Sequence, residues 1–196
     1  MKEVLIILFS AILVDNFVLS RFLGICPFLG VSKNLKTAMG MSMSVIFVMV
    51  LATVITWPIY HLLLLPNDLA YLQTMIFILV IASLVQLIEI FLKKAVPPLY
   101  KALGVFLPLI TTNCAILGVT ILNIDETYGF GSSIVNSLGA GLGFMLALFL
   151  FAGVRRKVDQ ANVPKFFKGL PITLVSAALV SISFFGFKGL IENIFK

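Results

Sequence analysis

The sequence predicts an all-α integral membrane protein with six transmembrane helices, arranged as two inverted three-helix repeats. Hydrophobic residues make up 61% of the 196-residue chain, charged residues make up 11%, and the mean hydropathy is +1.16. A soluble domain of this composition could not cover its core with a polar surface. The chain has 2 cysteines, and each opens a similar phrase in a different half, Cys26 to Val31 and Cys114 to Val119. These matched phrases predict the repeat.

Six apolar segments reach the roughly 20 residues that a helix needs to cross a bilayer. They are bounded by charges or turn-forming residues and run at about 4–31, 38–65, 71–92, 100–122, 132–153 and 170–192. We expect a single membrane domain over 1–196, with one repeat at about 1–92 and the other at about 93–196. No cleavage site follows the first apolar segment, so we expect the mature chain to begin at Met1.

Basic residues mark the first, third and fifth connections between these segments. They are Lys33, Lys36, Lys93, Lys94, Lys101, Arg155, Arg156, Lys157, Lys165 and Lys168. Short basic loops stay on the cytoplasmic side, which predicts that both termini lie on the outer side. The net charge of +6 therefore indicates membrane orientation, with lipid as the surroundings and no binding of nucleic acid.

Aligning the two cysteine phrases equates the first segment with the fourth. Three crossings per copy invert the second copy and place equivalent residues near the middle of the membrane. Gly24, Pro27 and Gly30 weaken the helical pattern in one copy, as Pro108 and Gly118 do in the other. We expect the first helix of each repeat to be broken there, the plainer alternative being a proline kink in a continuous helix.

The chemistry of the two cysteines leaves three uses open: inert thiols, a disulfide, or a metal site. Neither cysteine lies in an outer loop, which disfavours a stabilising disulfide, and no Cys-x-x-Cys pair is present. A 2Fe-2S cluster usually takes four thiolates. Cys26 and Cys114 would supply half of them, and a second subunit of similar build would supply the rest.

Polar residues inside apolar segments are costly and often functional. Asp15 and Asn16 in the first segment and Glu89 in the third are candidates for an ion path, because carboxylate and amide oxygens suit a hard cation. Simple ion pairs are the alternative, Asp15 with Arg21 and Glu89 with Lys93.

Polar residues also precede the second cysteine. Asn113 is a candidate donor to a cluster sulfur, and Thr112 is a candidate neighbour of the same site, although capping of the broken helix is the favoured role of Thr111 and Thr112. The glycines of segment 139–143 resemble a nucleotide-binding loop only superficially, since they follow no strand. They predict close helix packing instead.

Two blocks carry a resemblance to a known family. DNFVLSRFLGICPFLGVSK at 15–33 and FLPLITTNCAILGV at 106–119 resemble the signature blocks of the A-type membrane subunits of Rnf electron-transport complexes. The likeness covers nearly the whole chain, including the Pro97-Pro98-Leu99-Tyr100 turn. The E-type subunit of the sodium-translocating NADH:quinone reductase shares the architecture, but the two cysteine phrases fit the Rnf family better.

The resemblance implies a subunit of a ferredoxin:NAD oxidoreductase complex in the prokaryotic cytoplasmic membrane, one that couples electron transfer to sodium or proton translocation. It implies that Cys26 and Cys114 ligate a 2Fe-2S cluster shared with a homologous E-type subunit of opposite orientation. It also implies that other Rnf subunits carry flavin and further iron-sulfur centres, so this chain alone has no complete active site. A small-solute secondary transporter with inverted repeats and a structural subunit with inert cysteines stay open as other functions.

Overall fold

The computed structural model describes residues 7–8, 10–14, 16–32, 35–95, 110, 113–164 and 166–194. The elements within these residues are all helices. Three of them are long and apolar enough to cross a membrane, over Thr37–Leu64, Ala70–Ile90 and Phe130–Gln160. The predicted class, an all-α membrane protein, is confirmed to this extent.

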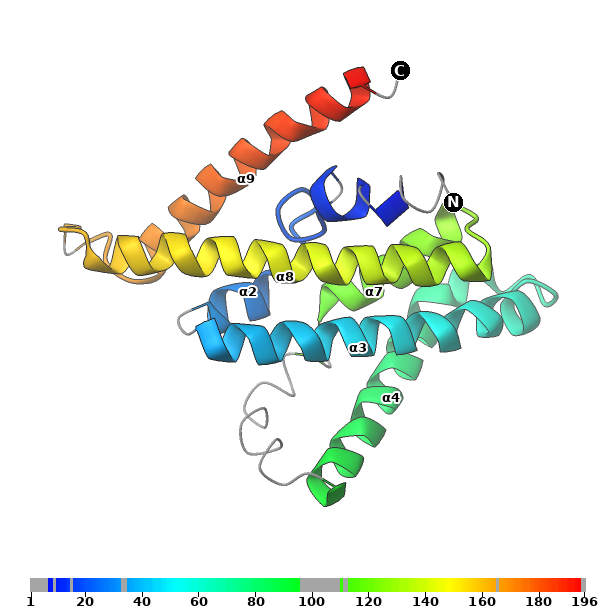
Figure 1. Cartoon of the computed structure of the whole chain (residues 1–196). Coiled ribbons are helices and arrows are strands. Elements are labelled where there is room, and N and C mark those ends of the chain that lie inside the picture. Colours follow the sequence, from blue (N-terminus) through cyan, green and yellow to red (C-terminus); the bar gives the residue numbers. More distant parts are fainter. Residues whose placement is uncertain are drawn as a thin grey trace.

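Two long helices form the centre of the molecule. Helix α3 (Leu35–Ile59) is extended by the π-helix η2 (Tyr60–Leu64), and helix α8 (Phe130–Gln160) packs along α3 in the most extensive contact of the fold. Figure 1 shows that the two helices run in opposite directions. Helices satisfy their backbone polar groups internally, which lets these long apolar segments remain in lipid. Their buried side chains form the core, including Val45, Met49, Ala52, Phe144, Ala147, Leu148 and Phe151.

Glycines on α8 allow close approach on two sides. A Cβ added to Gly141 would lie 2.8 Å from Cγ1 of Ile46 on α3. A Cβ added to Gly139 would lie 3.0 Å from the Ala11 Cβ of the π-helix η1 (Ser10–Val14). At Gly143 the nearest atoms are the carbonyl oxygens of Ala11 and Ile12, at 3.1 and 3.2 Å. The predicted close packing through these glycines is confirmed.

Gly143→Ala should destabilise the protein, because its new methyl group would press on two backbone oxygens that have little freedom to shift. We expect a loss of about 1–3 kcal/mol in the free energy of unfolding, the usual cost of overpacking. Thermal denaturation of the purified protein in detergent measures it. Gly153→Ala is the matched control on the same helix, since no atom lies within 4 Å of its added Cβ. Equal midpoints for the two variants would contradict the packing argument.

Two short helices carry the cysteines. Helix α2 (Ile25–Val31) has 7 residues and helix α7 (Cys114–Asp125) has 12. At 1.5 Å per residue they are about 10 and 18 Å long, so neither crosses a hydrocarbon layer of about 30 Å. Turns over 17–20 and 23–24 separate η1 from α2, which confirms the predicted break in the first segment. Helix α7 starts at Cys114, well inside the predicted segment 100–122, whose residues 100–109 lie outside the described part.

The remaining helices leave the central pair at opposite ends. Helix α4 (Gln73–Ala95) follows the 3-10 turn η3 (Ala70–Leu72), and helix α9 (Leu170–Ile194) follows the connection after α8. In Figure 1, α4 and α9 diverge on opposite sides of the α3–α8 pair, while the starts of α2 and α7 lie near its middle.

One boundary was predicted wrongly. Helix α8 continues to Gln160 instead of ending near 153, so Arg155 lies on a helix and not in a cytoplasmic loop. Only 8% of Arg155 is exposed. Its guanidinium donates to groups at the end of α2, and these partners make its burial tolerable.

Candidate metal centre

The starts of the two short helices meet. The backbone N–H of Gly24, the residue before α2, donates a hydrogen bond of 2.9 Å to Sγ of Cys114, the first residue of α7. Since Gly24 lies two residues before Cys26, this bond joins the two cysteine phrases across 90 positions of sequence. Figure 1 shows α2 and α7 extending from this contact toward opposite ends of the molecule. The two phrases that resemble each other in sequence are therefore neighbours in space.

Gly24 can make this contact only because it has no side chain. Its φ of +83° is a left-handed conformation that other residues adopt at a cost. An added Cβ would also lie 3.1 Å from Phe144 Cε2 and 3.2 Å from both Ala115 Cβ and Asn113 Oδ1. The backbone amide therefore sits in a close-fitting cradle made by α7 and α8, and it is aimed at the Cys114 sulfur.

Asn113 determines where α7 begins. Its side-chain Oδ1 accepts a hydrogen bond of 3.1 Å from the N–H of Ala115, which makes it the N-cap and places Cys114 in the first turn. Its Nδ2 is buried and has no hydrogen-bond partner among the described residues. Capping is thus the role that the geometry shows for Asn113, while donation to a sulfur stays a prediction. Thr111 and Thr112 lie outside the described residues.

Both cysteines are free and exposed on the surface of this chain. Their neighbours are buried, Pro27 and Phe28 on α2 and Ala115 on α7. A buried thiol acting as a small hydrophobe is therefore not what the structure shows at either position. No group of three or more His, Cys, Asp and Glu side chains that could hold a metal occurs among the described residues. The part of the chain described here offers two exposed cysteines and not a complete set of metal ligands.

Asn16 holds the broken first segment in place. Its Oδ1 accepts hydrogen bonds from the N–H groups of Val18 (3.1 Å) and Leu19 (3.3 Å). Its Nδ2 donates to the carbonyl oxygens of Gly143 (2.8 Å) and Ile12 (3.3 Å). Both polar atoms of this buried side chain are thus engaged with backbone. They replace hydrogen bonds that a continuous helix would have made.

The other ion-path candidates are not brought to Asn16 within the described residues. Asp15 lies outside them, and Glu89 is half-buried on α4. Figure 1 shows α4 on the opposite side of the α3–α8 pair from η1. An ion path through these three residues stays a prediction.

Asn16→Asp separates a structural role from ion binding. Aspartate keeps the acceptor for Val18 and Leu19 but loses both donors and places a carboxylate oxygen against the Gly143 carbonyl. We expect a loss of about 1–3 kcal/mol in the free energy of unfolding, the cost of an unmade buried hydrogen bond. Thermal denaturation in detergent measures it, with Asn67→Asp as the exposed control. An Asn16→Asp protein as stable as the wild type would contradict the structural role.

A polar cavity that the sequence did not reveal lies beside the turn over 17–20. It has a volume of about 270 Å³ and is lined by residues that include Ser10, Arg21, Glu126 and Asn136. Behind it, Asn136 Nδ2 donates to Asn123 Oδ1 at 2.7 Å. Asn123 in turn donates to Ser137 Oγ at 3.1 Å, which lies 2.6 Å from Thr53 Oγ1. No spacing rule could have found this network, since its members come from three helices.

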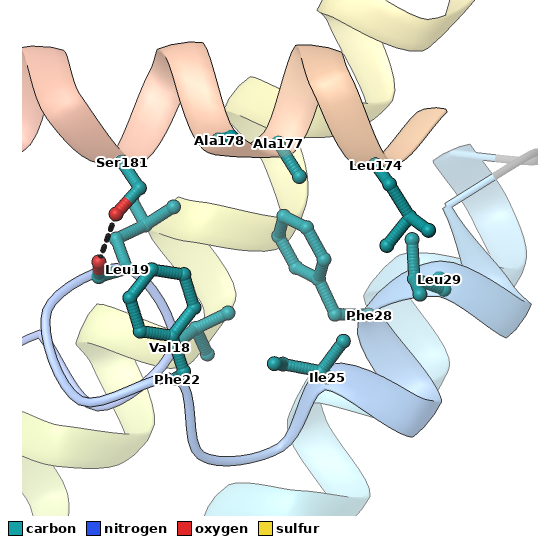
Figure 2. Close-up of a pocket in the computed structure, with 10 residues that line it drawn as sticks. All are labelled: Val18, Leu19, Phe22, Ile25, Phe28, Leu29, Leu174, Ala177, Ala178 and Ser181. Atoms are coloured by element: carbon teal, nitrogen blue, oxygen red, sulfur yellow. Dashed lines mark hydrogen bonds between the residues drawn. The ribbon is translucent and has the colours of Figure 1, made fainter. Parts of the chain in front are cut away.

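Figure 2 shows a second pocket, between α9 and the segment over 18–29 that contains Cys26. It is about 90 Å³ in volume, and its lining is apolar except for Ser181: Val18, Leu19, Phe22, Ile25, Phe28, Leu29, Leu174, Ala177 and Ala178. Ser181 on α9 donates a hydrogen bond to the Leu19 carbonyl. Helix α9 thereby fastens the turn that leads into Gly24.

Comparison with known proteins identifies the family. The model of the family described as "Rnf-Nqr subunit, membrane protein" matches residues 4–191. The chain is 54% identical over 193 residues, 98% of this chain and 100% of the relative, to the A-type subunit of the ion-translocating oxidoreductase complex of Syntrophotalea carbinolica. It is 57% identical over 184 residues, 94% of this chain and 96% of the relative, to the A-type subunit of the Na(+)-translocating ferredoxin:NAD(+) oxidoreductase complex of Acetobacterium woodii. With this identity and coverage, the chain belongs to the Rnf-Nqr family of membrane subunits, and within it to the A type.

Proposed function

We propose that this chain works in an ion-translocating ferredoxin:NAD oxidoreductase complex, as its A-type subunit, and carries electrons through the membrane by a 2Fe-2S cluster shared with a homologous E-type subunit. The names of the relatives support a place in an ion-translocating oxidoreductase complex. The observation that carries the electron-transfer role is the Gly24–Cys114 hydrogen bond, which joins the starts of the two helices that bear exposed thiols.

The residues fit half of such a cluster. Four thiolates are the usual ligand set, and Cys26 and Cys114 supply two on a surface that another subunit can reach. An N–H donated to a cysteine sulfur stabilises the thiolate and tunes the potential of a bound iron, which is the contact that Gly24 makes. The missing ligands would come from the equivalent cysteines of the partner.

In this proposal each residue has a separate task. Cys26 and Cys114 bind iron, and the Gly24 amide orients the Cys114 sulfur. Asn113 keeps Cys114 in the first turn of α7 by capping that helix. When bound, the cluster supplies a site that takes up and releases electrons. The starts of the two short helices lie away from both ends of the long α3–α8 pair, and a cluster bound there would divide the distance that electrons must cross.

We further infer that the chain has six spans in two inverted repeats. The opposite directions of α3 and α8, the opposed short helices and the divergence of α4 and α9 support this arrangement. The basic connections support an orientation in the cytoplasmic membrane with both termini outside. The E-type partner would be inserted the other way up, and other Rnf subunits would carry the flavin and further iron-sulfur centres.

The test is electron paramagnetic resonance of the purified complex after reduction, with iron and acid-labile sulfide measured on the same sample. The proposal expects a 2Fe-2S signal that co-purifies with this chain and its E-type partner. A complex that contains both subunits and gives no such signal would contradict it. A solute that binds the isolated chain and is transported without iron would favour the secondary transporter instead.

A further inference from the structure

A buried cation supports the helix that carries Cys26. Nη1 of Arg155, on α8, donates to the Leu29 carbonyl at 2.6 Å and to the Ser32 hydroxyl at 2.7 Å. Leu29 lies in the last turn of α2, and Ser32 is its C-cap. One turn earlier on α8, the Phe151 ring stacks on Phe28 with centroids 4.3 Å apart. Helix α8 therefore contacts α2 both along the side of α2 and at the C-terminal end of α2.

Among the described residues, no carboxylate forms an ion pair with Arg155. Its Nε is buried and has no hydrogen-bond partner within the same part of the chain. A guanidinium keeps its charge at any physiological pH. The carbonyl end of α2 is the negative end of a helix dipole, which favours a cation there. The C-terminal end of α2 is thus bound by the positively charged guanidinium of Arg155, which is buried.

Helix α7 is held differently. Asn123, near its C-terminal end, donates to Ser137 on α8 and accepts from Asn136. These are neutral groups. Both short helices therefore have polar anchors on α8, but a buried charge accompanies only the anchor of α2 among the residues described.

We propose that Arg155 is a positioning residue for the redox site: it fixes α2 so that Cys26 meets its metal, and its charge raises the reduction potential of that metal. This inference rests on the proposed function. Helix α2 is about 10 Å long. Cys26, near its start, therefore lies within about 10 Å along the helix axis of the C-terminal end that Arg155 binds. Reduction adds negative charge to a cluster, and a buried cation at that range favours the reduced form because a low-dielectric interior screens it weakly.

The experiment compares four versions of the intact complex: wild type, Arg155→Met, Arg155→Lys and Arg156→Gln. Methionine keeps much of the bulk of Arg155 and removes its charge, whereas lysine keeps the charge and can still donate to Leu29 or Ser32. Arg156 is the matched control, because it is the exposed neighbour on the same helix. Iron per complex and the midpoint potential, from a redox titration followed by electron paramagnetic resonance, are measured for each.

We expect Arg155→Met to lose part of its iron and to shift the remaining signal to a more negative potential. Arg155→Lys should restore the potential toward wild type, and Arg156→Gln should match wild type in both measurements. A wild-type signal whose potential is the same in Arg155→Met overturns this inference and leaves the proposed function intact. An equal shift in Arg155→Lys also overturns it, since that shift would follow from altered packing and not from charge. A wild type without any signal overturns both.

Discussion

Cys26→Ser and Cys114→Ser should each abolish the 2Fe-2S signal of the complex, because each removes one of the four thiolates that such a cluster usually takes. A serine hydroxyl stays protonated at neutral pH and is a poor replacement for a soft sulfur ligand. We expect loss of the signal, loss of cluster iron and loss of ferredoxin-dependent NAD reduction by the complex. The three measurements belong on one preparation, so that iron content and activity can be compared directly.

The structure indicates that these substitutions spare the fold. Both cysteines are exposed, and the new hydroxyl oxygen in Cys114→Ser could still accept the Gly24 N–H. Thermal midpoints of the iron-free chains should therefore match that of the iron-free wild type. Ser183→Ala is the control, because among the described residues this exposed hydroxyl bonds within its own helix alone, to the Leu179 carbonyl. A cysteine variant that retains full cluster iron would remove that residue from the ligand set.

Gly24→Ala should disturb the same site without touching a ligand. Alanine at a φ of +83° costs about 1–2 kcal/mol, and its methyl group would press on Phe144, Ala115 and Asn113. Overpacking of this kind adds about 1–3 kcal/mol. Because the cradle can relax in part, we expect a total loss of about 2–4 kcal/mol in the free energy of unfolding.

Relaxation around the Gly24→Ala methyl group should also move the N–H away from Cys114 Sγ. We therefore expect fewer iron atoms per complex and, since an N–H bonded to sulfur favours the reduced cluster, a more negative midpoint potential. Gly40→Ala on α3 is the matched control, since its added Cβ meets no atom within 4 Å. Wild-type stability and potential in Gly24→Ala would show that the close fit at this position is unimportant.

The membrane class could be read from the sequence because it depends on local properties. Each long apolar run is stable in lipid by its own transfer free energy and its own helical hydrogen bonds, whatever its neighbours do. This is why α3, α4 and α8 lie where composition predicted them. The break at Gly24 was also local, since glycine weakens a helix at its own position, whereas Pro27 and Gly30 lie within α2.

Arg155 shows where this reasoning failed. A basic residue next to an apolar run is normally read as a loop residue on the cytoplasmic side. The hydrogen-bond partners that allow its burial, Leu29 and Ser32, lie 126 and 123 positions away. Asn16 also has a distant partner, since its shortest hydrogen bond goes to a carbonyl 127 positions away, while its role as an ion ligand stays a prediction. The local sequence pattern around Arg155 and Asn16 gives no sign of these distant partners.

Composition and the two similar cysteine phrases were sufficient to predict a helical membrane protein and the family that those phrases resemble. Composition and repeated phrases are properties of the chain that survive without any tertiary contact. The folded arrangement was needed to show that the Gly24 amide meets the Cys114 sulfur, that both cysteines are exposed and that a buried arginine binds the helix of Cys26. These contacts depend on how α2, α7 and α8 pack against one another, and packing joins residues by shape and hydrogen bonding irrespective of their distance along the chain.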